Sequence, residues 1–258
     1  QEHVITVGTL DDKEQVAQMF SKYNFLALPV VDTENRLVGI VTFDDAMDVM
    51  EDETTEDMEK MAAMLPSEHP YMRSTPFEIW KNRIPWLLLL MVSATLTGIV
   101  ITKFEDSLAV LPCLTAFIPM LMDTGGNSGS QACVSIIRGI SLNEIEFRDL
   151  GKVVWKEIRV SVLCGVCLAV ACFAKIVVVD MLLLKTASVS YMVAFVVCIT
   201  MAVTVCLAKI VGSTLPLLAK KLGFDPAVMA SPIITTIVDF LSLLVYFTFA
   251  TTILHIGS

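Results

Sequence analysis

The segment GFDPAVMASPIITTIVDFLSLLVYFTFATTIL, residues 223–254, decides the class of this protein. Between residues 227 and 254 it holds a single charged residue, Asp239, and this run is long enough to cross a bilayer as a helix. Charge inside hydrocarbon is costly, so an ionisable residue there marks a functional site by default. We therefore expect Asp239 to lie in a cation pathway, where a cation, a proton or water compensates the carboxylate.

The chain divides into an acidic part and an apolar part. Hydrophobic residues make up 55% of its 258 residues, yet the formal net charge is -9. Most carboxylates precede residue 80, and the chain after residue 85 is mainly apolar. Such an acidic surface attracts divalent metals and repels nucleic acid, so we expect no nucleic-acid partner. Because the chain begins at Gln1 in the middle of what reads as a domain, we also expect a fragment of a longer polypeptide.

Five apolar segments meet the length needed to span a lipid bilayer. They are residues 85–102, 107–137, 160–179, 187–208 and 227–256. Basic residues gather before the first segment, between the second and third, and between the fourth and fifth. The positive-inside rule then predicts a multi-pass protein of the cell membrane, with the N-terminal region in the cytoplasm and the C-terminus outside.

The first 43 residues predict a partial α/β module. We expect strands at residues 4–7, 27–31 and 37–42, a helix at residues 12–23 and a turn at residues 32–35. The stretch LALPVVDTENRLVGIVTFDDAMDVM, residues 26–50, resembles the second half of a CBS motif. Modules of that type pair into regulatory units that respond to adenosine nucleotides or metals. The resemblance thus implies an adenine nucleotide as a candidate ligand of a complete pair, which a single motif does not form.

Residues 44–76 predict an acidic connecting helix followed by a linker. Carboxylates one turn apart repel each other along a helix, and bound divalent cations would relieve that repulsion. The segment is therefore either a cation sensor or a solvated acidic linker. The carboxylates in question are those of Asp45, Asp48, Glu53, Glu56 and Asp57.

A polar block interrupts the second apolar segment. The stretch PMLMDTGGNSGSQACVSIIRG, residues 119–139, contains glycines that allow close helix approach, and Asn127 adds an amide oxygen. Polar groups at membrane depth are tolerated where they pack in protein or line a wet cavity. The block therefore indicates either a pathway lining or a helix-packing motif.

The fifth segment carries a second polar set. Five residues recur at spacings of three or four and are expected to share one helix face: Ser231, Thr235, Asp239, Ser242 and Tyr246. Pro232 lacks an N–H, so we expect it to leave the carbonyl of Val228 available to a cation or its water shell. The alternative is a Pro-kinked helix whose aspartate is neutral or paired with a lysine such as Lys175 or Lys209.

The chain resembles the MgtE family of magnesium transporters. The resemblance lies in the order of its parts: the CBS-type module, the acidic helix, the five apolar segments, the TGGN block and the segment quoted first. The resemblance implies a homodimer whose second and fifth membrane helices line one ion pathway, with the acidic helices as a magnesium-sensing plug. It matches Asp239 to the essential pore aspartate and Thr235 to a backbone-carbonyl contributor, while Ser231 stands where some relatives have Asn. The five acidic-helix residues named above match acidic positions of the plug.

The sequence thus predicts a mixed fold in three parts: a partial CBS-type module (residues 1–43), the acidic helix and linker (44–76) and a five-helix membrane domain (77–258). It predicts a Mg2+-selective channel or transporter that takes up Mg2+ down its electrochemical gradient and is closed by cytosolic Mg2+. Mg2+ prefers oxygen ligands and dehydrates reluctantly, and two Asp239 carboxylates on a two-fold axis would balance one such ion. Soft ligands are missing from the Asp239 face, which argues against copper or zinc as the main substrate.

No enzymatic activity is expected, because the three histidines form no HExxH motif and no phosphate-binding GxxxxGK[ST] loop is present. Two alternatives stay open. One is a non-transporting membrane receptor for Mg2+, and the other is a broader divalent cation transporter that also carries Mn2+ or Co2+.

Overall fold

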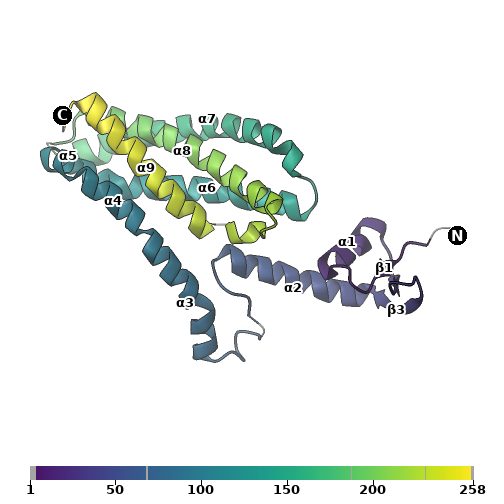
Figure 1. Ribbon diagram of the computed structural model, residues 1–258. Coiled ribbons are helices and arrows are strands. Elements are labelled where there is room, and N and C mark those ends of the chain that lie inside the picture. Colours follow the sequence, from purple (N-terminus) through teal and green to yellow (C-terminus); the bar gives the residue numbers. More distant parts are fainter. Residues whose placement is uncertain (1–3, 68, 187, 230, 257–258) are drawn as a thin grey trace. The chain divides into compact units, whose positions relative to one another are not determined.

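The computed structural model describes residues 4–67, 69–186, 188–229 and 231–256, with the side chain of Ser231 excluded. The chain forms two compact units (Figure 1). The N-terminal unit comprises residues 1–59 and 66–68, and the helical unit comprises residues 60–65 and 69–258.

The N-terminal unit is a three-stranded sheet with two helices. Its elements are β1 (Val7–Gly8), α1 (Lys13–Tyr23), β2 (Ala27–Val31), β3 (Leu37–Thr42) and α2 (Phe43–Met61), of which the last two residues belong to the helical unit. β2 lies between β1, to which it is parallel, and β3, to which it is antiparallel. A small core holds the unit together, formed by Val7, Ala17, Phe20, Leu28 and Ala46.

Local side-chain signals explain where these elements begin and turn. The Asp12 carboxylate accepts hydrogen bonds from the backbone N–H groups of Glu14 at 2.9 Å and Gln15 at 3.3 Å, so it caps α1. The Asp32 carboxylate likewise accepts from the N–H groups of Glu34 and Arg36 in the hairpin between β2 and β3. The expected α1, β2 and β3 are confirmed, whereas the first strand is shorter and later than the expected residues 4–7.

Four helical segments in the described part of the chain are long and apolar enough to cross a membrane. They are Pro76–Lys103, Phe147–Leu183, Tyr191–Lys221 and Pro226–Leu254. The first combines α3 (Pro76–Ser93) and α4 (Thr95–Lys103). The second combines η2 (Phe147–Asp149), α7 (Leu150–Lys175) and η3 (Ile176–Leu183); the third is α8 (Tyr191–Lys221), and the fourth is η4 (Pro226–Met229) with α9 (Ser231–Leu254).

The expected single segment at residues 107–137 is wrong in its bounds. The chain there forms α5 (Glu105–Val110), η1 (Pro112–Phe117) and α6 (Ile118–Ser141). Pro112 and Pro119 stand at the starts of η1 and α6, where a missing N–H costs least, and each opens a new helix. The four candidate spans therefore confirm four of the five expected segments, and α6 is a 24-residue helix outside that set.

The helix start at residue 76 precedes the expected start at residue 85 because a capping box lies upstream. The Thr75 hydroxyl accepts from the N–H of Glu78 at 3.3 Å, and the Glu78 carboxylate accepts from the N–H of Thr75 at 2.7 Å. Pro85 consequently lies inside α3. No described side chain of α3 is buried within this single chain, so its apolar surface is left for lipid or another protein.

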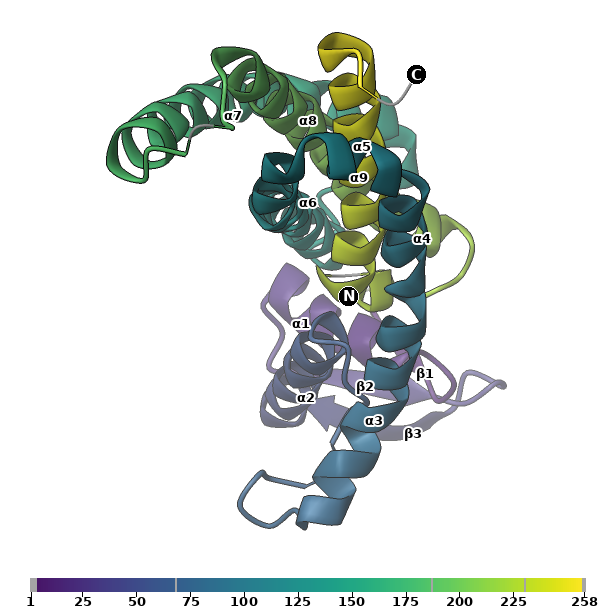
Figure 2. The ribbon, with the colours of Figure 1, turned by 90° about the vertical axis from the view of Figure 1, so that its left-hand side faces the viewer.

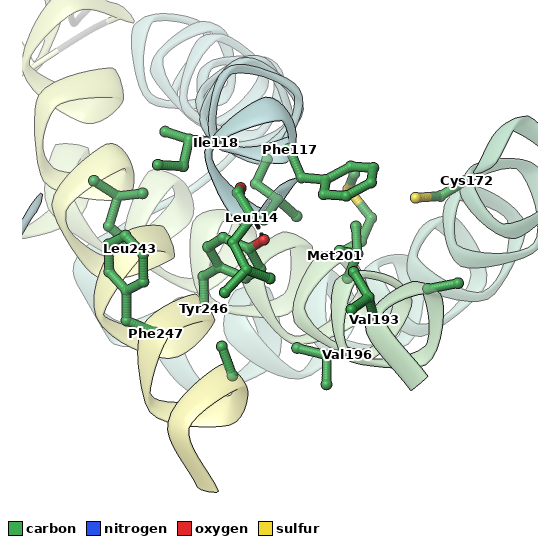
Figure 3. Close-up of a cluster of buried hydrophobic side chains, with 14 of the residues drawn as sticks. Leu114, Phe117, Ile118, Cys172, Val193, Val196, Met201, Leu243, Tyr246 and Phe247 are labelled. Atoms are coloured by element: carbon green, nitrogen blue, oxygen red, sulfur yellow. Dashed lines mark hydrogen bonds between the residues drawn. The ribbon is translucent and has the colours of Figure 1, made fainter. Parts of the chain in front are cut away.

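The helices α6, α8 and α9 pack against one another, as both ribbon views show (Figures 1 and 2). A large apolar cluster fills one end of this group (Figure 3). At its centre the buried Tyr246 hydroxyl of α9 donates a 3.0 Å hydrogen bond to the carbonyl of Leu114 in η1. Phe117, Met201 and Leu243 pack around this pair. The hydrogen bond satisfies a polar group that would otherwise be costly in so apolar a place.

Glycines bring the backbones of α6 and α8 together. A Cβ atom added at Gly212 of α8 would collide with the carbonyl oxygen of Gly129 in α6. A Cβ atom at Gly125 would lie 2.7 Å from the Cγ2 atom of Thr204 and 3.0 Å from the hydroxyl of Ser242. Small residues commonly allow this kind of close approach between membrane helices.

We expect Gly212→Ala to destabilise the helical unit by about 1–3 kcal/mol, because its methyl group must push α6 and α8 apart. The control is Gly98→Ala in α4, where an added Cβ atom meets no other atom within 4 Å. Since alanine is the better helix former, that change should leave stability equal or raise it by up to about 1 kcal/mol. Unfolding in detergent measures both variants, and equal stability of the two would contradict the close-contact argument.

We also expect Tyr246→Phe to lower the free energy of unfolding by about 1–3 kcal/mol, because it leaves the buried carbonyl of Leu114 without its donor. Tyr191→Phe provides the matched control, since that side chain is exposed at the start of α8. The same unfolding measurement applies. An equal decrease in the free energy of unfolding of both variants would contradict a specific contribution of the Tyr246 hydrogen bond to stability.

Candidate ion pathway and magnesium-sensing region

Asp239 and Thr235 of α9 lie against Gly126 of α6. A Cβ atom added at Gly126 would be 3.7 Å from the Asp239 Oδ1 atom and 3.0 Å from the Thr235 Cγ2 atom. A Cβ atom at position 126 would therefore crowd Thr235 and come into ordinary contact with Asp239, the two residues that the sequence predicts for the pathway. The structure thus brings the TGGN block of α6 and the Asp239 face of α9 together.

Asp123 is a second carboxylate next to this contact, and it was missed in the sequence reasoning. It is exposed on α6, one turn before the exposed Asn127, and its charge repels that of Asp239. The signal was available, because Asp123 stands directly before the TGGN block and is the single carboxylate of α6. Two neighbouring helices therefore present acidic and amide oxygens near one another.

No lysine neutralises Asp239 within the described part of the chain. Lys175 instead forms a 2.8 Å ion pair with Asp180 in η3. Lys209, only 5% exposed in α8, forms no ion pair with Asp239. The lysine-paired aspartate considered as an alternative is thus not what the described residues show. A carboxylate in this setting needs another source of compensating charge, such as a cation or a proton.

The remaining residues that the sequence predicts for the pathway lie near the start of α9. Pro232 is the second residue of this helix and lies at its start, so it does not form the kink that the alternative interpretation required. Val228 precedes the helix in η4, where its N–H donates to the carbonyl of Asp225 at 3.3 Å. The Thr235 hydroxyl donates to the carbonyl of Pro232 at 2.9 Å and keeps its lone pairs as acceptors. Ser231 opens α9, and its side chain lies outside the described residues.

The polar face of α9 has two different environments. Thr235 and Asp239 are partly exposed, whereas Ser242 and Tyr246 are fully buried. The Ser242 hydroxyl donates to the carbonyl of Val238 at 2.6 Å, and Tyr246 is used in the core as described above. Only the first part of the face is therefore open to an ion in this chain.

The five expected sensor carboxylates of α2 have different surroundings. Asp45 accepts from the N–H of Thr42 at 3.2 Å and from its hydroxyl at 2.5 Å, so it caps the start of the helix. Glu53 pairs with Lys13 of α1 at 2.9 Å, and Asp48 is exposed. Glu56 and Asp57 are partly buried and each has an interaction partner. Among the described residues, no three or more His, Cys, Asp or Glu side chains are arranged to hold a metal ion.

The end of α2 is tied to the start of η4 within the helical unit. Lys60 donates to the Asp225 carboxylate at 2.6 Å, and the other Asp225 oxygen accepts from the N–H of Ala227 at 2.8 Å. Met61 packs on the cluster that contains Ile234 and Val238 of α9. The last two residues of the acidic helix therefore contact the segment that leads to Asp239, a link that sequence reasoning did not anticipate.

The chain is similar in sequence to known proteins. Residues 118–249 match the family model MgtE, described as a divalent cation transporter, and residues 1–52 match the CBS domain. Proteins named magnesium transporter MgtE from Thermus thermophilus and from Bacillus subtilis are each 36% identical to this chain over 252 residues. The matched residues cover 98% of this chain and 54% of each relative. The one from Enterococcus faecalis is 33% identical over 249 residues, 96% of this chain and 52% of its own.

The chain spans about half the length of the curated relatives it matches. The family match runs through α6, α7 and α8 and into α9, and so includes both the TGGN block and Asp239. On this evidence the chain belongs to the MgtE family of divalent cation transporters.

Proposed function

We propose that this chain carries the pathway of a Mg2+-selective channel or transporter, which takes up Mg2+ down its electrochemical gradient and is closed by cytosolic Mg2+. The observation that carries the proposal is the contact of Asp239 with the glycine block of α6, without a lysine to neutralise it among the described residues. Family membership and relatives named as magnesium transporters support Mg2+ as the ion.

The pathway ligands in this proposal are all oxygen atoms. Asp239 supplies negative charge, Asn127 an amide oxygen, and Thr235, Val228 and Ser231 backbone or hydroxyl oxygens. Mg2+ loses water reluctantly, so such groups would bind the hydrated ion through its water shell. We add Asp123 to this set, because its repulsion with Asp239 would be relieved by a cation between them.

A homodimer completes the proposal. On a two-fold axis, two Asp239 carboxylates would carry the two negative charges that balance one Mg2+ ion. We propose α6 as a fifth span in addition to the four candidate spans, which puts the N-terminal unit in the cytoplasm and the C-terminus outside. The three parts are then the CBS-type module (residues 1–43), the acidic helix and linker (44–76) and the membrane domain (77–258).

For gating, we propose that the acidic helix binds Mg2+ when the ion is plentiful. The sensor carboxylates Asp45, Asp48, Glu53, Glu56 and Asp57 follow one helix, and like charges at such spacing repel. Mg2+ would bridge them to neighbouring groups, and its loss would release the closed arrangement. The link of Lys60 to Asp225 supports this coupling, because it joins the end of the same helix to the start of η4.

We expect Asp239→Asn to lower Mg2+ flux into proteoliposomes by about tenfold or more. Loss of the partner of a desolvated charge costs several kcal/mol, and ~1.4 kcal/mol already corresponds to a factor of ten. Asp106→Asn in α5 is the control, because that carboxylate is exposed and the change removes the same charge. Equal flux in wild type and Asp239→Asn would contradict the pathway and favour a receptor that does not transport. Flux of Mn2+ and Co2+ in the same vesicles tests the broader transporter.

The double substitution Glu56→Gln/Asp57→Asn tests the sensor. We expect the internal Mg2+ concentration that halves the flux to rise by about tenfold, because Mg2+ affinity decreases when charged ligands are removed. Glu105→Gln/Asp106→Asn is the matched control, because it also neutralises two adjacent carboxylates, on α5. An unchanged half-inhibiting concentration in the first variant would remove these two residues from the sensor.

A further inference from the structure

Lys13 places a positive charge on the acidic helix. Its Nζ atom lies 2.9 Å from the Glu53 Oε1 atom, with the lysine side chain 64% exposed and the glutamate side chain 23% exposed. The hydrogen bond and the charge of Glu53 raise the pKa of Lys13 above its usual value, and the charges of Glu56 and Asp52 act in the same direction. The ammonium group therefore interacts with several carboxylates of α2 and is neutralised chiefly by one of them.

The surrounding structure determines where this ammonium lies. Lys13 is the first residue of α1, directly after the cap Asp12, whereas Glu53 lies in the middle of α2. The two helices belong to the same unit and share one core through Ala17, Phe20 and Ala46. A cation is thus held beside Glu53 by the packing of the unit as well as by its charge.

We propose that Lys13 is a tethered competitor of Mg2+, which occupies Glu53 when the metal is scarce and sets the cytosolic Mg2+ concentration at which the pathway closes. The inference rests on the proposed function. The ammonium group occupies one oxygen of the Glu53 carboxylate and offsets its negative charge, so a Mg2+ ion that binds this carboxylate must compete with it. The lysine side of the pair is open to water, so the ion pair is of modest strength and Mg2+ can displace the ammonium group.

Lys13→Met removes the charge and keeps much of the aliphatic stem. We expect the internal Mg2+ concentration for half inhibition to fall by about two- to fivefold, the range that corresponds to an exposed ion pair. Lys13→Arg keeps a cation and should stay close to wild type. Lys22→Met is the matched control: it removes the same charge from the last turn of α1, where Lys22 lies over the ring of Tyr23.

The experiment measures Mg2+ flux in proteoliposomes at titrated internal Mg2+, without nucleotide, because Lys13 also lines a surface cavity of about 360 Å³ in this unit. A lower half-inhibiting concentration in Lys13→Met alone supports the proposal. An unchanged or higher value overturns it, and so does an equal fall in Lys22→Met, which would show an effect of net charge only. In a Glu53→Gln background, Lys13→Met should have no further effect, and a full effect there also overturns the proposal.

Calorimetric titration of the same proteins in detergent with Mg2+ separates this proposal from gating itself. If internal Mg2+ does not inhibit flux in wild type, the proposed gating fails. Tighter Mg2+ binding by Lys13→Met than by wild type would then still support competition at Glu53. Equal binding by the two proteins would overturn the competition as well.

Discussion

The close contact of α6 and α8 at Gly129 and Gly212 is the constraint on which the helical unit depends. Lipid is as apolar as the helix surfaces, so membrane helices associate through packing and hydrogen bonds more than through burial from water. With no side chain at either glycine, two backbones come close enough for α9 to pack on both helices. That packing in turn places Asp239 beside Gly126. The position of the Asp239 carboxylate therefore depends on the glycines at the contact between α6 and α8.

The same arrangement separates buried polar groups from partly exposed ones along a single helix face. Farther along α9, Ser242 and Tyr246 are buried and satisfied by backbone carbonyls. Closer to its start, Thr235 and Asp239 are partly exposed, with Asp123 and Asn127 on the neighbouring helix. The hydrogen bonds of the buried residues fix one end of α9 in the helical unit. The side-chain oxygens at the other end remain partly exposed.

Features set by local chemistry were predictable from sequence, and features set by packing were not. The Asp12 cap and the Asp32 turn lie within a few residues of what they stabilise, so α1, β2 and β3 appeared with correct bounds. Pro232 has no such local signal, because a proline can kink a helix or begin one, and the apolar residues before it suit either. The pairs of Lys13 with Glu53 and of Lys60 with Asp225 join residues 40 and 165 positions apart, and only the folded chain brings them together.

The acidic helix belongs to both units at once, with residues up to Glu59 in one and Lys60 and Met61 in the other. α2 runs without a break from Phe43 to Met61 and is therefore a rod of about 28 Å, at ~1.5 Å per residue. Loss of its last turn would therefore also remove the ion pair of Lys60 with Asp225 and the packing of Met61 beside Ile234 and Val238, so the end of this helix depends on the fold of the helical unit.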